Sequence, residues 1–451
     1  MKPLIPTSLW FLLVACGGDG STADTSSPGT PDTPDIADTA DTPDVADTAD
    51  APDLGDTDLD TAESTDAPEV EIKPGPIAAL ETLEASLLAL PEAERDAALT
   101  AWIESQPRIP LAENETAVFL WRGPATEVRM VGDATSWNAQ TSPRLTRLDV
   151  AGVDLWWLAQ TYDSASRLDY KLVLDGSDWR LDPLNPELMP GGFGPNSELA
   201  MPDYVEPAEV RDLEGTPAGA LATHIIESTA LSQSRTIHVY EPAGADVEGP
   251  RPLVIFHDGN DYRTLIRAQL ILDRIVQTGE VGPLVAVFAQ PTNRTAEYNR
   301  NDAYVSHLAD EVVPFMRTTY NAGQSAAVTG TIGPSFGGLI ACYVAFTRPE
   351  VFGLAGCQSG AYSYDDDAFI DLVRDSAKVD MKTLYLVVGT YELAVSGSST
   401  EGNLLEAQRR LVTVLSDKGY TFTAEELPQG HSWGLWRDTL PTALRVLWGA
   451  E

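Results

Sequence analysis

The stretch that decides the fold is Thr329-Gly330-Thr331-Ile332-Gly333-Pro334-Ser335-Phe336-Gly337-Gly338, which is followed by an apolar helical run over residues 339–346. It places a G-x-S-x-G motif between a β-branched strand and a helix, the context that a nucleophile elbow needs. The motif requires Gly333 and Gly337, because the serine is strained and close strand–helix packing leaves no room for Cβ atoms. The Ser335 hydroxyl then projects at a helix N-terminus, where anionic charge is favoured, so we predict that Ser335 is a nucleophile.

Apolar strands alternate with helical segments on both sides of this motif. Near-continuous β-branched runs separated by helices indicate a mostly parallel sheet that is covered on both faces. Together with the elbow, this pattern predicts a doubly wound α/β-hydrolase fold, and we assign residues 216–451 to the catalytic domain. The predicted strands include residues 235–240, 252–257, 284–288, 326–332 and 384–388.

A serine hydroxyl is a poor nucleophile without a general base. The five histidines are His224, His238, His257, His307 and His431. In α/β-hydrolases the chain order is serine, acid and then histidine. His431 alone follows Ser335, in a turn after the strand-like residues 422–427, so we predict that it is the base.

The acid of such a triad lies between the serine and the histidine, just beyond a strand end. Glu392 follows the predicted strand 384–388 and is the favoured candidate. We expect its carboxylate to hold the His431 tautomer and to stabilise the imidazolium. The alternatives in the same interval are Asp365, Asp366, Asp367 and Glu401.

Two backbone amides are expected to stabilise the oxyanion of an acyl-transfer reaction. One belongs to Phe336, the residue after the nucleophile. The second should come from the loop that follows strand 252–257, where Gly259 and Asn260 are the candidates. Tyr262 ends this loop, and we expect it to contact the substrate.

Residues 76–215 predict a helical pair followed by a β-rich module. Apolar residues recur at helical spacing over 78–90 and 92–103, with Pro91 between the two helices. After Pro110 the apolar period changes to two, which indicates a small antiparallel sandwich. Its aromatic residues could bind sugars, but we favour their burial in the core. They are Trp121, Trp137, Trp156, Trp157 and Trp179.

Several motifs in both halves resemble the enterochelin (enterobactin) esterases. In the first half they are residues 119–123, 131–133 with Trp137, 182–186 and 202–204. In the second half they are His257-Asp258-Gly259, the stretch from Arg294 to Tyr304, and Trp433 with Trp436-Arg437. The resemblance implies an immunoglobulin-like, substrate-facing accessory module and a serine esterase domain whose triad positions are occupied by Ser335, Glu392 and His431.

The resemblance also implies hydrolysis of a small-molecule or glycan ester without a cofactor. Trilactone siderophores are the best-known substrates of that family, and feruloyl and acetyl-xylan esterases and mycolyltransferases lie near it. We expect Arg294 and Trp433 to contact the substrate. Four arginines could form a local basic pocket, and the alternative is that they pair with neighbours such as Glu297. They are Arg263, Arg267, Arg294 and Arg300.

The first 75 residues are interpreted as an export signal and a tether. A positive start and a short apolar core end at Cys16, which resembles the lipobox of bacterial lipoproteins, so residues 1–16 are the expected signal peptide and Cys16 the lipidated residue. Gly17 follows rather than an Asp, which by the same resemblance implies the outer membrane of a Gram-negative bacterium. Residues 17–75 are rich in Asp, Thr and Pro, and we favour a disordered spacer over a calcium site.

The composition excludes several classes of protein. A net charge of -39 argues against nucleic-acid binding, which depends on Lys and Arg at phosphates. No Cys/His spacing suggests a metal site. Three cysteines are too few for a disulfide scaffold, and we expect Cys342 and Cys357 to be free buried thiols rather than a bridge, because both positions are typical of a core.

Two alternatives to an ester hydrolase remain at this point. The tether and the aromatic-rich sandwich are compatible with a surface-binding lipoprotein whose hydrolase half is inactive. A complete triad is also compatible with an acyltransferase that passes the acyl group to an alcohol instead of water.

Overall fold

The computed structural model describes residues 75–211, 217–244, 248–394 and 403–449. They belong to one compact unit, Val70–Glu451. The predicted signal peptide, the predicted lipidation site Cys16 and all but the last residue of the predicted tether lie outside the described residues. Within the described ranges, no helix combines the length and the apolar character that a bilayer span requires.

The first described elements are the predicted helical pair. Helix α1 (Gly75–Leu88) and helix α2 (Glu92–Ser105) are separated at Pro91, which stands directly before the second helix. Helix α1 buries leucines at helical spacing, and these pack with Leu99 of α2 and with one sheet of the β-sandwich. The apolar residues that recur at helical spacing in α1 therefore pack against α2 and the sandwich.

The β-rich module is a sandwich of two antiparallel sheets. One sheet has the strand order β1-β2-β5-β4, and the other has the order β3-β6-β9-β8, with β7 paired to β6. Trp121 and Trp156 are buried, Trp157 packs against the core, and Trp179 is exposed on β7, so most of these aromatics lie in the core. The strands of the first sheet are β1 (Leu111–Glu113), β2 (Thr116–Arg122), β4 (Thr146–Arg147) and β5 (Leu155–Thr161). The others are β3 (Val128–Gly132), β6 (Arg167–Leu174), β7 (Asp178–Arg180), β8 (Leu188–Met189) and β9 (Asn196–Ala200).

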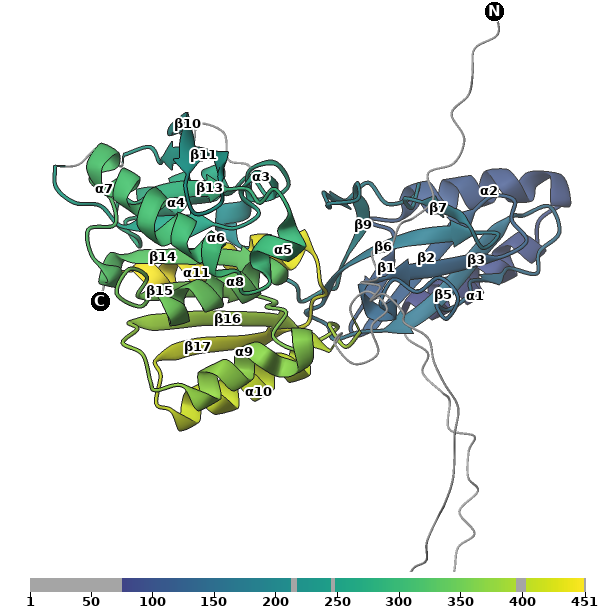
Figure 1. Ribbon diagram of the computed structural model, residues 1–451. Helices are drawn as coiled ribbons and strands as arrows, with labels where there is room; N and C mark the ends of the chain where they lie inside the picture. The colour runs from purple at the N-terminus through teal and green to yellow at the C-terminus, as the bar shows by residue number, and fades with distance from the viewer. Residues whose placement is uncertain (1–74, 212–216, 245–247, 395–402, 450–451) are drawn as a thin grey trace, which may run out of the picture. The chain divides into compact units, whose positions relative to one another are not determined.

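The second half is built on one eight-stranded sheet with the order β10-β11-β13-β12-β14-β15-β16-β17. Strands β10 and β11 form an antiparallel hairpin, β11 runs antiparallel to β13, and all further pairs are parallel. Strands β14 to β17 lie side by side in Figure 1. The strands are β10 (Ala220–Ser228), β11 (Gln233–Glu241), β12 (Leu253–Phe256), β13 (Val285–Ala289), β14 (Thr329–Pro334), β15 (Leu354–Gln358), β16 (Thr383–Gly389) and β17 (Phe422–Leu427).

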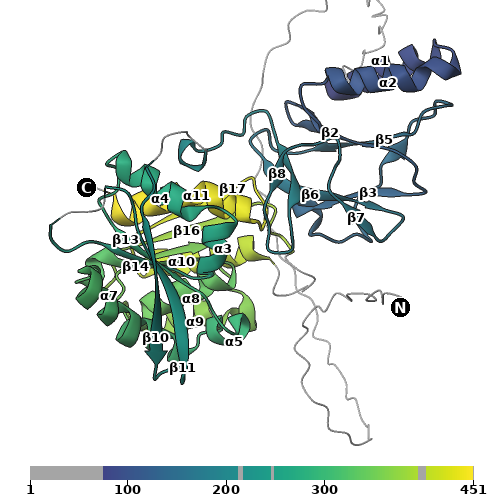
Figure 2. The ribbon, with the colours of Figure 1, turned by 90° about the horizontal axis from the view of Figure 1, so that it is seen from above.

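Helices cover both faces of this sheet, as predicted (Figure 2). Strand β12 shows why its sequence is continuously apolar: Ile255 points into the cluster with α7 to α10, whereas Phe256 points into the cluster with α4 and α11. The helices are α3 (Gly259–Thr264), α4 (Ala268–Gln277), α5 (Arg294–Tyr298), α6 (Asp302–Ser306), α7 (Val313–Tyr320), α8 (Phe336–Thr347), α9 (Tyr364–Asp375), α10 (Leu404–Asp417) and α11 (Trp433–Trp448).

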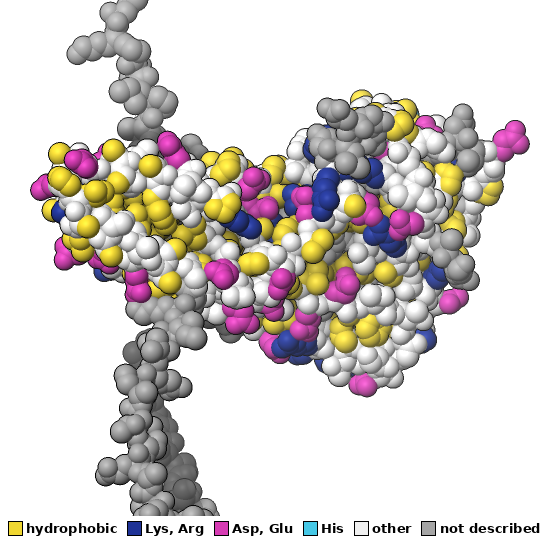
Figure 3. Space-filling view, turned by 180° about the vertical axis from the view of Figure 1, so that it is seen from behind, with side chains coloured by type: hydrophobic (Ala, Val, Ile, Leu, Met, Phe, Trp, Pro, Cys, Tyr) yellow, Lys and Arg dark blue, Asp and Glu magenta, His cyan; other side chains and the backbone are white. Residues whose placement is uncertain are grey.

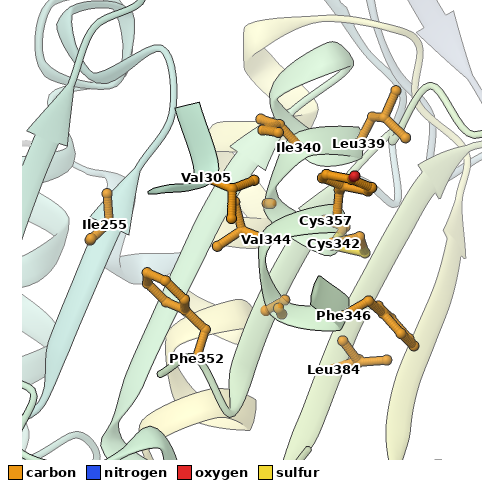
Figure 4. Packing of buried hydrophobic residues seen from close by; sticks show 14 of the residues in the cluster. Ile255, Val305, Leu339, Ile340, Cys342, Val344, Phe346, Phe352, Cys357 and Leu384 are labelled. Carbon is orange, nitrogen blue, oxygen red and sulfur yellow. A yellow bond between two sulfur atoms is a disulfide. The ribbon is translucent and has the colours of Figure 1, made fainter. Parts of the chain in front are cut away.

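Cys342 and Cys357 are joined by a disulfide, so the prediction of free thiols is wrong. Cys342 lies on α8 and Cys357 on β15, and Figure 4 shows the bond inside the core beneath the helix. The two Cα atoms are 6.1 Å apart, within the range that a disulfide spans. Burial alone does not distinguish two thiols from a bridge, because both fit a core.

We predict that this disulfide stabilises the fold. It closes a loop with a sequence separation of 15. The entropy that such a loop removes from the unfolded chain adds about 3 kcal/mol to the free energy of unfolding. Dithiothreitol should therefore lower the free energy of unfolding in urea by about that amount. The variant with Cys342→Ala and Cys357→Ala should show no such response to dithiothreitol. Alkylation of both cysteines in denaturant without reductant would contradict the bridge.

Candidate active site

The turn at Ser335 has the geometry of a nucleophile elbow. Strand β14 ends at Pro334, Ser335 has φ 60° and ψ -122°, and α8 begins at Phe336. The Ser335 amide donates to the Gln358 carbonyl oxygen at 2.8 Å, which ties the strained residue to the neighbouring strand. The strain is therefore held by the sheet.

The two glycines of the motif are sterically required. A Cβ on Gly333 would lie 2.2 Å from the carbonyl oxygen of Gly337. A Cβ on Gly337 would lie 2.8 Å from the Pro334 ring and 3.0 Å from Asp258 Oδ2. These distances agree with the reason given for both glycines from the sequence.

His431 lies within hydrogen-bond distance of Ser335. Its Nε2 is 3.1 Å from Ser335 Oγ. The imidazole stands edge-on to the Trp436 ring, with the ring centres 5.1 Å apart. Its side chain is 19% exposed, so the ring is largely but not wholly shielded from water.

Glu392 is wholly buried behind His431. Its Oε2 lies 2.7 Å from His431 Nδ1, and its Oε1 accepts from the Gly389 amide at 2.8 Å and from Ser359 Oγ at 2.7 Å. Because an ionised carboxylate only accepts hydrogen bonds, Nδ1 carries the proton and Nε2 is free to accept from Ser335. The structure thus brings the three predicted residues into one hydrogen-bonded chain.

The other acids considered from the sequence are engaged elsewhere or are not described. Asp365 pairs with Arg300, and Asp367 forms two bonds with Arg410. Asp366 is exposed at the start of α9. Glu401 lies outside the described residues.

Sequence reasoning missed Ser359, which orients the buried carboxylate. Its hydroxyl accepts from Trp436 Nε1 at 2.9 Å and donates to Glu392 Oε1. The bond from Trp436 therefore fixes the hydroxyl so that its proton points to the carboxylate. The signal was available in part, because Ser359 directly follows β15 at the sheet edge that bears the other site residues.

Two of the three predicted oxyanion donors stand at the start of a helix. Phe336 and Gly259 are the first residues of α8 and α3, and the first amides of a helix have no acceptor within it. The Asn260 amide, in contrast, donates to Gln290 Oε1 at 3.1 Å. Gly259 is the better candidate, and a Cβ there would lie 2.5 Å from the Phe288 backbone.

Arg294 links the two turns that carry the Gly259 and Phe336 amides. Its guanidinium makes two short bonds to the buried carboxylate of Asp258, Nε to Oδ1 at 2.9 Å and Nη2 to Oδ2 at 2.7 Å. The same Nη2 donates to the Pro334 carbonyl oxygen at 3.2 Å. Asp258 precedes Gly259 and Pro334 precedes Ser335, so Arg294 braces both turns. Its side chain is 41% exposed, which leaves it accessible to a ligand.

The described residues contain no cluster of His, Cys, Asp and Glu side chains that could hold a metal ion. His257 is buried beside β14, where it contacts Thr331 and Tyr304. His307 bonds Glu311 at 2.7 Å in a π-helical turn between α6 and α7. These two histidines are held in the interior by polar side chains and do not reach Ser335.

The comparisons with known proteins point to one family. Residues 228–447 match the family model described as "Putative esterase". The iron(III) enterobactin esterase of Escherichia coli is 25% identical over 279 residues, which cover 59% of this chain and 67% of that protein. This chain is an esterase with an α/β-hydrolase fold, similar to the enterochelin esterases. An uncharacterized protein of Bacillus subtilis, YbbA, is also 25% identical over 206 residues, which are 42% of this esterase and 80% of the relative.

A solved structure shows the same fold over most of the esterase. The ferric enterobactin esterase of Salmonella typhimurium superposes with a TM-score of 0.66 at 20% identity and covers 77% of this chain and 98% of that one. The similarity therefore extends beyond the α/β-hydrolase half to the residues of the sandwich.

Two residues predicted to contact the substrate of the esterase are part of its core instead. Tyr262 is wholly buried, packs its ring at a tilt against Phe256 and hydrogen-bonds Gln358. Trp433 is 9% exposed and packs edge-on against Tyr262 and Trp436. Both predictions are corrected, because the sequence marks these aromatics as near the site but not the direction in which their rings point.

Two of the four arginines expected to form a basic pocket are neutralised by carboxylates. Arg294 pairs with Asp258 and Arg300 with Asp365, whereas Glu297 pairs with Arg235. On the face in Figure 3, basic side chains lie in small groups beside acidic ones. Ion pairing, the alternative that the sequence left open, therefore describes Arg294 and Arg300.

We predict a pH-dependent contribution of His257 to stability. Burial, with the nearby Arg294 charge, lowers the pKa of His257 to about 3. Since an unfolded histidine titrates near 6.5, the unfolded chain binds more protons between these values, and stability falls as the pH drops through that window by about 1.4 kcal/mol per unit. His257→Gln should flatten the profile when urea unfolding is compared at pH 7, 6 and 5. Parallel profiles for the parent and the variant would contradict the assignment.

Proposed function

We propose that this esterase hydrolyses carboxylic esters with Ser335 as nucleophile, His431 as general base and acid, and Glu392 as the orienting acid. The observation that carries the proposal is the unbroken chain Ser335 Oγ–His431 Nε2–His431 Nδ1–Glu392 Oε2, with 3.1 Å and 2.7 Å at its two hydrogen bonds. Both distances lie in the range of productive proton transfer.

In the first half-reaction Ser335 Oγ attacks the ester carbonyl carbon while its proton moves to His431 Nε2. The carbonyl oxygen becomes an oxyanion, which the amides of Phe336 and Gly259 stabilise. Glu392 stabilises the imidazolium without taking its proton. Collapse of the tetrahedral intermediate breaks the ester C–O bond, and His431 returns the proton to the leaving alkoxide.

In the second half-reaction water attacks the acyl group on Ser335. His431 removes a proton from that water and then donates it to Ser335 Oγ as the acid product leaves. The elbow needs no rearrangement between the halves, because its strained φ is held by the bond from Ser335 N to Gln358 O.

We infer that the substrate is a small-molecule or glycan ester. The relative from Escherichia coli is an iron(III) enterobactin esterase, so enterobactin is the first ester to assay. The pairing of Arg294 and Arg300 with carboxylates leaves less free positive charge for an anionic siderophore, which makes feruloyl and acetyl-sugar esters the necessary comparison. The values of kcat/KM for enterobactin, a feruloyl ester and an acetyl-sugar ester, measured with the same preparation, rank the three as substrates.

We propose that the protein is exported and lipid-anchored at Cys16. The sequence of residues 1–16 supports this, and a buried disulfide in the folded body is typical of proteins that mature outside the reducing cytosol. Expressed in a Gram-negative host, the protein should incorporate labelled palmitate and sediment with outer membranes, and Cys16→Ala should abolish the label. Equal labelling of the variant would contradict the anchor.

We predict the following order of losses in p-nitrophenyl acetate hydrolysis by a fragment lacking residues 1–69, since Val70–Glu451 is a compact unit. Ser335→Ala and His431→Ala should each lower kcat by about 10⁶-fold, and their combination should cost no more than either alone. Glu392→Gln should cost less, about 10⁴-fold. The control Ser376→Ala, at an exposed serine, should match the parent. Full activity of Ser335→Ala would refute the proposal.

A further inference from the structure

The loop that carries His431 is held from behind by a buried arginine of the sandwich. Arg167, the first residue of β6, is 0% exposed. Its amide donates to the Pro428 carbonyl oxygen at 3.2 Å, and its Nη1 donates to Ser432 Oγ at 3.1 Å. The two contacts lie on either side of His431 in the chain, so Arg167 fixes both ends of the turn.

The guanidinium is itself rigidly placed. Its Nη2 lies 2.7 Å from Asp169 Oδ1 and 2.6 Å from Glu198 Oε2, and its Nε donates to the same Glu198 oxygen at 3.0 Å. A planar fork with several fixed partners loses little freedom when it makes one more bond. A Cβ on Gly434 would lie 1.9 Å from Nη1, so the guanidinium fills the space at the start of α11.

A second sandwich residue supports the same turn. A Cβ on Gly430 would lie 2.2 Å from the Cβ of Asp133, so the Asp133 side chain packs directly against the Gly430 backbone next to His431. The Asp133 carboxyl group is fixed by the Asp169 amide at 2.8 Å and by Trp137 Nε1 at 3.0 Å. Burial next to Asp169 raises the pKa of Asp133 to about 7, as expected where acids outnumber cations.

The segment that carries the acid is held by the sandwich as well. Tyr391, next to Glu392, has its hydroxyl 3.2 Å from Ser166 Oγ, and its ring stands edge-on to Tyr162 with the centres 6.1 Å apart. The Tyr391 amide donates to the Gln429 carbonyl oxygen at 3.2 Å, which joins this segment to the histidine turn. The orienting pair is therefore built against the sandwich.

We propose that the sandwich is part of the catalytic apparatus and that Arg167 is a positioning residue, which sets the His431 imidazole against Ser335 Oγ. This inference rests on the proposed function. It goes beyond the substrate-facing role that the family resemblance implies for this module. Displacing a reacting group by about 1 Å costs on the order of 10²-fold in rate. Arg167 does not reach the substrate, so its loss should lower kcat and leave KM nearly unchanged.

The test compares Arg167→Met, Arg167→Lys and Ser432→Ala in the full chain with p-nitrophenyl acetate, at a temperature where circular dichroism shows each variant folded. Arg167→Met should lower kcat by 10- to 100-fold with KM within about two-fold. Arg167→Lys should fall between Met and the parent, because lysine keeps the charge but not the fork. Ser432→Ala, which leaves both ion pairs of Arg167 intact, should lower kcat by a few fold.

Arg129→Met is the matched control. Arg129 is another largely buried arginine of the sandwich, but it pairs with Glu127 and bonds the Ser142 carbonyl oxygen, far along the chain from residues 428–432. The Arg129→Met variant should have a lower melting temperature than the parent but the same kcat. An equal loss of kcat in Arg129→Met would show that any damage to the sandwich has this effect and would overturn the specific role of Arg167.

The decisive comparison places Arg167→Met in the His431→Ala background. If Arg167 acts through the imidazole, the residual rate should change by less than about two-fold. An additional 10-fold loss there, or a folded Arg167→Met with the parent kcat, would overturn the inference. Failure of the proposed function looks different. In that case Ser335→Ala and His431→Ala would each keep the activity of the parent.

Discussion

The site depends on the bond between the buried Glu392 carboxylate and His431 Nδ1. Gly389 N and Ser359 Oγ occupy one carboxylate oxygen, which leaves the other to face the imidazole. A carboxylate without those donors would be costly to bury and free to turn. Because it is satisfied and fixed, the imidazole has one tautomer and presents a bare Nε2 to Ser335.

The strand order explains how residues far apart in the chain meet at this bond. Strands β14, β15, β16 and β17 are consecutive neighbours and run parallel, so their carboxyl ends share one edge of the sheet. Each end supplies one residue of the network, namely Ser335, Ser359, Glu392 and His431. The chemistry at that edge follows from the topology, and a ligand site at the carboxyl ends of such strands is general for open α/β sheets.

Local patterns carried enough information to predict the elbow, the sheet class and the histidine. The motif around Ser335 has its own strand and helix, and His431 is the one histidine downstream of it. Strand β10 left a weaker signal, because exposed positions of this edge strand carry the apolar residues Leu221 and Ile225, so its sequence does not alternate as its burial does. The partners of a side chain are not local: the Cys342 bridge, the burial of Tyr262 and the bond from Arg167 to a serine 265 positions away appear only when the chain is packed.

The arginine contacts also change how the sandwich is understood. A module that merely contacted substrate would not need a wholly buried cation beside three carboxyl groups at the back of the His431 turn. Buried charges are costly unless they are well paired, and here the pairing fixes the position of a turn. The two halves of Val70–Glu451 therefore share one polar network.

The most direct test of the central claim is to map the residue that a fluorophosphonate probe modifies. The reagent phosphonylates only a serine whose oxygen is activated by a base, so peptide mass spectrometry should place the adduct on Ser335 of the parent. The rate of labelling should fall sharply in His431→Ala while the fold is retained. An adduct on another residue, or unchanged labelling of Ser335 without the imidazole, would contradict the account.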